Sequence, residues 1–170
     1  GSRTIVNINT LALSDGSGIA TNYTLTNGTL TMTIVPRSTT VSGTKTYDGT
    51  TNVASSNLTS FSNLAGSDTL SISGTGTIST ADVGTGKTVN TSGLTIDNSS
   101  GVGSNYTLSA ATVNVTERVI GLSGVRAFDG TNNASSTDLS ISNLVSGENL
   151  TLSGSGTVPN ATVEMNLSLI

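Results

Sequence analysis

Residues 29–34 read Thr-Leu-Thr-Met-Thr-Ile, so that polar and apolar side chains alternate without a break. Alternation with a period of two places Leu30, Met32 and Ile34 on one face of a β-strand. Apolar pairs at the same spacing recur along the chain at Leu70 and Ile72, Leu94 and Ile96, Val113 and Val115, Leu139 and Ile141, and Leu150 and Leu152. Because no stretch shows sustained 3.6-residue periodicity, the pattern predicts an all-β chain of short strands.

Turn-forming residues separate the expected strands. Dipeptides that tolerate the positive φ of tight turns stand at Asp15-Gly16, Asn27-Gly28, Asp48-Gly49 and Asp129-Gly130. Ser, Thr, Asn and Gly make up 95 of the 170 residues, while Leu, Ile, Val and Phe supply 42, which is enough for a core. These features predict tandem small antiparallel β-sandwich-like repeats of the immunoglobulin type, with a β-grasp-like arrangement as the second choice.

The composition excludes several classes of site. The chain has no Cys and no His, which removes thiolate nucleophiles, imidazole bases and zinc fingers. Its six Lys and Arg residues are scattered, so we expect no nucleic-acid partner, and no apolar run is long enough to predict membrane insertion. We expect no cofactor. Calcium stays open only if loops gather scattered carboxylates, which are Asp68, Asp82, Asp97 and Asp138.

An internal repeat organises the chain. Residues 45–50 (Lys-Thr-Tyr-Asp-Gly-Thr) return as 126–131 (Arg-Ala-Phe-Asp-Gly-Thr), a shift of 81. The segments 70–78 and 22–25 return after shifts of 80 and 83 residues, at 150–158 and 105–108. A period of about 80 residues suits a small domain and is far longer than one coil of a solenoid. One complete repeat therefore spans residues 38–118, between the back part of one repeat and the front part of another.

The complete repeat resembles the YDG domain and the related MBG repeats of large secreted adhesins of the filamentous-haemagglutinin type. The resemblance is carried by residues 45–51 (Lys-Thr-Tyr-Asp-Gly-Thr-Thr), 83–89 (Val-Gly-Thr-Gly-Lys-Thr-Val), 92–96 and 105–108, in the family's order. It implies repeat arrays on the outer surface of Gram-negative bacteria, exported by two-partner secretion, without catalytic activity. The last repeat departs from the pattern, since Phe128 replaces the tyrosine and Glu164-Met165-Asn166-Leu167 replaces Gly-Thr-Gly-Lys.

We interpret the most distinctive residues as structural. Tyr47, Asp48 and Gly49 are expected to form a turn after a strand, and the same holds for their counterparts Phe128, Asp129 and Gly130. Tyr23 and Tyr106 each precede an alternating strand. They resemble the tyrosine corner of immunoglobulin-like sandwiches, in which the hydroxyl group fixes a turn.

Two kinds of covalent modification can be considered from the sequence. Lys45 and Asn114 have the residue types of an intramolecular isopeptide bond, but we expect no bond, because the counterpart of Lys45 is Arg126. The chain has eleven Asn-x-Ser/Thr triplets, a mild enrichment that makes glycosylation a hypothesis. The candidate sites include Asn22, Asn57, Asn105, Asn114 and Asn149.

These features favour a non-catalytic stalk or spacer of a secreted, surface-held adhesin, giving reach in cell adhesion or biofilm formation. Its partners would be neighbouring repeats of the same parent chain. The alternative is a binding module for a host glycan or matrix protein. An enzyme is not expected, because a Ser or Thr nucleophile would need a base and histidine is absent.

The frame of the folding unit can be placed in two ways. We expect a shifted frame of two units, residues 3–81 and 84–170, in which Leu30, Met32 and Ile34 pack against Leu70 and Ile72. In the second unit, Val113 and Val115 would pack against Leu150 and Leu152. Such a chain would be a monomer. The other arrangement pairs the two partial repeats head to tail between chains, which would build filaments or rings.

Overall fold

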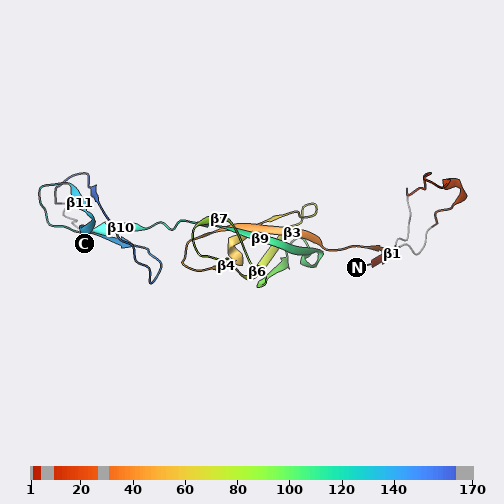
Figure 1. The fold of residues 1–170 in the computed structure, drawn as a ribbon, viewed down its shortest axis with the longest axis horizontal. Helices are drawn as coiled ribbons and strands as arrows, with labels where there is room; N and C mark the ends of the chain where they lie inside the picture. Colours follow the sequence, from red (N-terminus) through yellow and green to blue (C-terminus); the bar gives the residue numbers. More distant parts are fainter. Residues whose placement is uncertain (1, 5–9, 27–30, 164–170) are drawn as a thin grey trace, which may run out of the picture.

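A computed structural model describes residues 2–4, 10–26 and 31–163, and these form an elongated all-β chain (Figure 1). The all-β prediction is confirmed. The helical elements of the described residues are short 3-10 turns, namely η1 (Ala20–Asn22), η2 (Ser55–Asn57), η3 (Gly103–Asn105) and η4 (Ser136–Asp138). None of the described helices is long and apolar enough to cross a membrane. Along the long axis an N-terminal part, a central unit and a C-terminal part follow one another.

The central unit is built around a parallel pair of strands. β3 (Arg37–Thr46) and β9 (Tyr106–Thr116) pair from Arg37↔Tyr106 to Thr46↔Thr116. β5 (Leu58–Ser62) adds antiparallel to β3, and β7 (Gly84–Thr88) adds antiparallel to β9. The sheet order is β5-β3-β9-β7, so this sheet is mixed. The prediction of purely antiparallel sheets is therefore wrong here, because the first and last strands of the unit run in the same direction.

A second sheet covers the first. It has the order β4-β6-β8, formed by β4 (Asn52–Ala54), β6 (Leu70–Thr77) and β8 (Leu94–Asn98). A single cluster of buried side chains comes from both sheets and the segments that join them: Val41, Val53, Leu58, Ile78, Val89, Ala111, Val113 and Val115. The alternation in β9 buries Val113 and Val115 and exposes Asn114, as the period of two predicts. Immunoglobulin-like tandem repeats and the β-grasp-like alternative both stay predictions.

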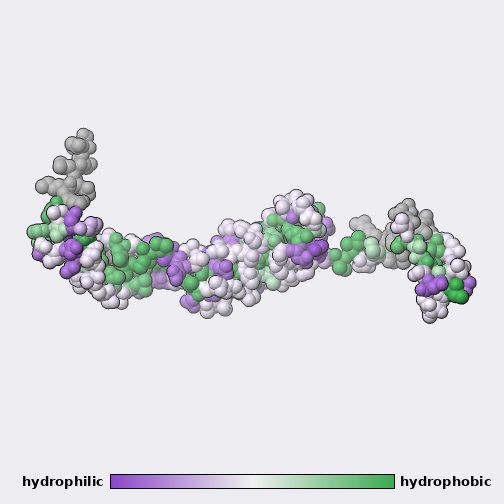
Figure 2. All heavy atoms as spheres, turned by 90° about the horizontal axis from the view of Figure 1, so that it is seen from above, coloured by the Kyte–Doolittle hydropathy of each residue, from purple (hydrophilic) through white to green (hydrophobic). Residues whose placement is uncertain are grey.

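The C-terminal part repeats the strand pairing of the first half of the central unit. β10 (Gly121–Gly124) pairs with β12 (Leu139–Ser142) in the register of β3 with β5. β11 (Asn133–Ser135) pairs with β13 (Ser155–Thr157) in the register of β4 with β6. Within the described residues this part has no counterparts of β7, β8 and β9. Its apolar side chains consequently reach the surface (Figure 2): Leu122, at the position of Val41, is 52% exposed.

The structure differs from the shifted frame of residues 3–81 and 84–170. The core takes strands from both sides of that division, since β3 to β6 precede it and β7 to β9 follow it. In the N-terminal part, β1 (Ser2–Thr4) pairs with β2 (Thr31–Thr33). Met32 and Ile34 are half-exposed and do not belong to the cluster against which Ile72 packs, so the structure does not show the expected packing. Leu30 lies outside the described residues.

The expected second cluster is also absent from the described core. Val113 and Val115 are buried in the central unit, whereas Leu150 and Leu152 remain exposed in the C-terminal part. The physical reason is that β9 pairs in parallel with β3, which places its apolar face in the core shared with the second sheet, formed by β4, β6 and β8.

We predict that truncation of Leu58 to Ala destabilises the central unit by about 2–5 kcal/mol, because Leu58 is fully buried. Leu122→Ala is the control, since an exposed truncation should change the free energy of unfolding by less than about 0.5 kcal/mol. Urea denaturation followed by circular dichroism measures both. Equal losses for the two variants would contradict a core confined to the central unit.

Candidate functional site

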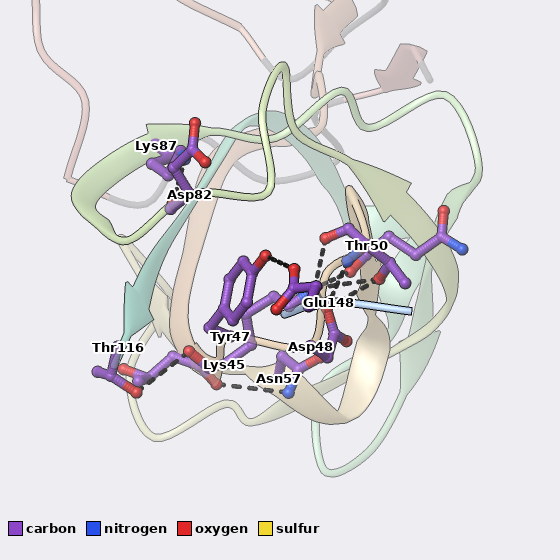
Figure 3. A network of polar contacts seen from close by, with 11 residues as sticks. Lys45, Tyr47, Asp48, Thr50, Asn57, Asp82, Lys87, Thr116 and Glu148 are labelled. Carbon is purple, nitrogen blue, oxygen red and sulfur yellow. Dashed lines mark hydrogen bonds and ion pairs between the residues drawn. The ribbon is translucent and has the colours of Figure 1, made fainter. Parts of the chain in front are cut away.

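The Tyr-Asp-Gly segment forms a tight turn at the end of β3 (Figure 3). The backbone N–H of Tyr47 donates to the carbonyl of Thr116, 2.8 Å away, which continues the pairing of β3 with β9. Asp48 Oδ1 accepts from both the backbone N–H and the hydroxyl of Thr50, each at 2.9 Å. Gly49 has a φ of 75°, a conformation that favours glycine. The segment is thus an Asx-type turn, in line with the structural interpretation.

A buried lysine lies directly beneath this turn. Lys45 Nζ donates to Asp48 Oδ1 at 2.8 Å and to the carbonyls of Thr50 and Asn52 at 3.0 and 2.7 Å. The side chain of Lys45 is 3% exposed, so these oxygens replace the water that an ammonium group needs. Burial raises the pKa of Asp48, but hydrogen bonds from Lys45 and Thr50 outweigh it, and the pKa lies below its ordinary value.

The C-terminal part has the same turn with different side chains. Asp129 forms an ion pair with Arg126 and accepts from the N–H and hydroxyl of Thr131, each at 2.9 Å. Gly130 has a φ of 78°. The hydrogen bond from Arg126, with those from Thr131, lowers the pKa of Asp129 to about 2. Phe128 takes the place of Tyr47 and is 65% exposed.

The side chain of Tyr47 reaches into the C-terminal part. Its hydroxyl donates to Glu148 Oε1, as Figure 3 shows. This hydrogen bond is the main reason that the pKa of Tyr47 lies above its ordinary value. Sequence reasoning missed Glu148. The available signal was its position, because Glu148 follows Asp68 by 80 residues and both carboxylates accept from a tyrosine hydroxyl.

The two corner tyrosines lie in different surroundings. Tyr106 is buried, and its hydroxyl accepts from the N–H of Ala65 at 3.0 Å and donates to Asp68. It therefore holds the loop that follows β5, and the hydrogen bond to Asp68 raises its pKa. Tyr23 lies in the N-terminal part after η1 and is 69% exposed.

Lys45 and Asn114 lie on opposite faces of the mixed sheet. Lys45 pairs with Val115 and shares its buried face, whereas Asn114 pairs with Thr44 on the exposed face. Asn114 Oδ1 accepts from the N–H of Gly86 at 2.7 Å. This geometry supplies a physical reason to expect no isopeptide bond between the two.

The candidate glycosylation sites are largely accessible. Asn22, Asn105, Asn114 and Asn149 are exposed, whereas Asn57 is half-buried. Glycosylation stays a prediction. In the part of the chain that the structure describes, no three acidic residues gather into a group that could hold a metal ion. Asp68 is engaged with Tyr106, and Asp138 accepts from the backbone N–H of Ser135.

We predict that Asp48→Asn destabilises the central unit by about 1–3 kcal/mol, because it leaves Lys45 buried without a counter-charge. Asp129→Asn is the matched control in the equivalent turn. Arg126 is 22% exposed, so water can replace the lost carboxylate and the effect should be smaller. Urea denaturation at pH 7 measures both, and a larger loss for Asp129→Asn would contradict the role assigned to burial.

The lowered pKa of Asp48 also predicts a pH dependence. A carboxyl group with a lower pKa in the folded state stabilises the fold above its unfolded pKa, and this contribution disappears as pH falls through the folded pKa. The stability difference between the wild type and Asp48→Asn should therefore shrink below about pH 4. Paired urea titrations between pH 7 and pH 2.5 measure it. A difference that grows toward low pH would have the wrong sign.

The central repeat matches a known family model. The model of the YDG domain family matches residues 29–114, which contain the signature turn, both sheets and most of the parallel pair. No curated protein matches the chain, and no solved structure does so. Because the matched segment covers half of the sequence, the chain belongs to the YDG domain family.

Proposed function

We propose that the chain is a non-catalytic structural repeat of a large secreted adhesin of the haemagglutinin-like, two-partner secretion type. It would be held on the outer surface of a Gram-negative bacterium, where serial repeats give reach in cell adhesion or biofilm formation. The observation that carries the proposal is that the Asp-Gly-Thr turn and the Arg–Asn contact at the start of the repeat recur in both copies. A module whose value lies in number and length needs such recurrence.

The junction at the start of each copy illustrates this recurrence. Arg37 Nε donates to the carbonyl of Asn63 at 2.8 Å, and Arg118 Nε donates to the carbonyl of Asn143 at 2.6 Å. Both asparagines have positive φ, 59° and 66°. Their amides donate back to the chain near the arginine, to the carbonyls of Ser38 and Val119. The same set of hydrogen bonds therefore ties the start of each copy to the loop after its third strand, which is β5 or β12.

The hydrogen bonds of the charged side chains also support a role without catalysis. The buried ammonium group of Lys45 is surrounded by the oxygens that hold its turn. Asp48 and Asp68 are likewise engaged with the turn and with Tyr106. Groups that serve as fixed structural partners favour a spacer over an enzyme.

A ligand-binding module is the second candidate. It is favoured by two exposed aromatic side chains, Tyr23 and Phe128, which offer faces on which a sugar ring could stack. They lie in the N-terminal and C-terminal parts, on either side of the central unit. A host glycan or a matrix protein would be the partner of such a surface.

We predict that the labelled chain shows no saturable binding to a glycan array or to immobilised matrix proteins at micromolar concentration. Saturable binding that is lost in Tyr23→Ala or Phe128→Ala would favour the ligand-binding module instead.

The spacer also predicts an extended shape in solution. Small-angle X-ray scattering should report a radius of gyration well above the roughly 15 Å expected for a compact domain of this length. A compact particle would contradict a serial arrangement.

A further inference from the structure

Specific hydrogen bonds hold the joint between the central unit and the C-terminal part. Only residues 117–120 separate β9 from β10, and Arg118 is tied to Asn143. Beside this linker, the hydroxyl of Tyr47 binds Glu148. A small hollow of about 200 Å³ remains there, lined on one side by Tyr47 and Val83 and on the other by Val145 and Glu148.

Gly49 has a second role at this joint. A Cβ atom at Gly49 would lie 2.7 Å from Val145 Cγ1, so a side chain there would require Val145 or the segment that carries it to shift. At Gly130, the equivalent glycine with nearly the same φ, a Cβ atom would meet nothing within 4 Å. The turn therefore needs glycine for its backbone in both copies, but the close approach of another repeat is present only at Gly49.

The other end of the central unit presents the matching surface. A hollow of about 450 Å³ lies between the linker residues 34–36 and the loop residue Ala65, beside Arg37 and Tyr106. Ala65 and Asp68 are the counterparts of Val145 and Glu148, which receive Tyr47 at the other joint. Asp68 already accepts from Tyr106, but a carboxylate offers about four acceptor positions, so it can accept a second hydroxyl.

We propose that the Tyr-Asp-Gly turn is the docking surface between successive repeats. In the observed joint, the hydroxyl of Tyr47 binds Glu148, and Gly49 leaves room for Val145. At the other end of the central unit, the turn of a preceding repeat would meet the equivalent residues, Asp68 and Ala65, in the same way. The occupant of the larger hollow is the Tyr-Asp-Gly turn of a preceding YDG repeat. This inference rests on the proposed function as a serial array, and it assigns to the signature turn the task of fixing the angle between repeats.

The joint can be measured in the full chain by double electron–electron resonance. Spin labels on Ser60→Cys and Ser140→Cys report the distance between β5 and β12, because both serines are exposed and the chain has no other cysteine. The parent pair should give one narrow distance distribution. Tyr47→Phe and Glu148→Ala should each raise the ratio of open to docked joints by about tenfold, the effect of losing a hydrogen bond to a charged group.

Two matched controls separate docking from general damage. Gly130→Ala carries the same backbone strain as Gly49→Ala, and Tyr23→Phe loses a hydroxyl from an exposed ring. Gly49→Ala and Tyr47→Phe should broaden the distribution, as Glu148→Ala does, whereas the two controls should leave it narrow. Circular dichroism checks that each variant folds. If Gly49→Ala does not fold, Tyr47→Phe alone tests the docking role.

An unchanged distribution in Tyr47→Phe, or equal broadening in the controls, would overturn the docking role. That result would not contradict the spacer function, because the spacer function is tested separately by the glycan-binding assay and by small-angle X-ray scattering. Conversely, saturable glycan binding would contradict the spacer function without changing the measured joint.

Discussion

The parallel pairing of β3 with β9 is the constraint on which the repeat depends. It joins the first and last strands of the unit over the whole length of β3, and these two strands supply Val41, Ala111, Val113 and Val115 to the core. Among its described residues, the C-terminal part gives β10 an antiparallel partner, β12, and no parallel one. Its antiparallel pairs keep their register, because each is set by nearby chain segments, yet Leu122 stays exposed. Pairing between nearby segments therefore forms the antiparallel strand pairs, whereas pairing of the distant strands β3 and β9 contributes the largest share of the core.

One end of that parallel pair is also the end at which repeats meet. The turn that follows β3 buries the ammonium group of Lys45. Asp48 and the carbonyls of Thr50 and Asn52 accept its hydrogen bonds. The same turn carries Tyr47, which packs against the core and donates its hydroxyl to Glu148. Asp48 accepts from both Lys45 and Thr50, so the internal ion pair stabilises the turn that carries Tyr47. Burial of one charge and presentation of a neighbouring side chain are parts of a single local structure.

The sequence was sufficient for the all-β class, the turns at Asp48-Gly49 and Asp129-Gly130, and the family. It was insufficient for strand direction and for the frame of the unit. Alternation specifies which face of a strand is apolar, but it carries no information about which strand lies alongside or in which direction. Met32 and Ile34 alternate as cleanly as Val113 and Val115, yet only the latter pair is buried. Glu148 was missed because a lone surface acid has no local signature.

Asp68 and Glu148 occupy equivalent positions and accept from tyrosines of different origin. Asp68 fixes Tyr106 of its own unit, while Glu148 receives Tyr47 from the unit before it. A carboxylate can accept from both kinds of tyrosine at once, since each oxygen has two lone pairs. The loop that carries this acid is held by Tyr106 only when the last strand of its own unit is in place. In the proposed array, Tyr106 would hold this loop in place for the contact with a preceding repeat, so that small, sparsely packed units would gain stiffness from a few polar contacts.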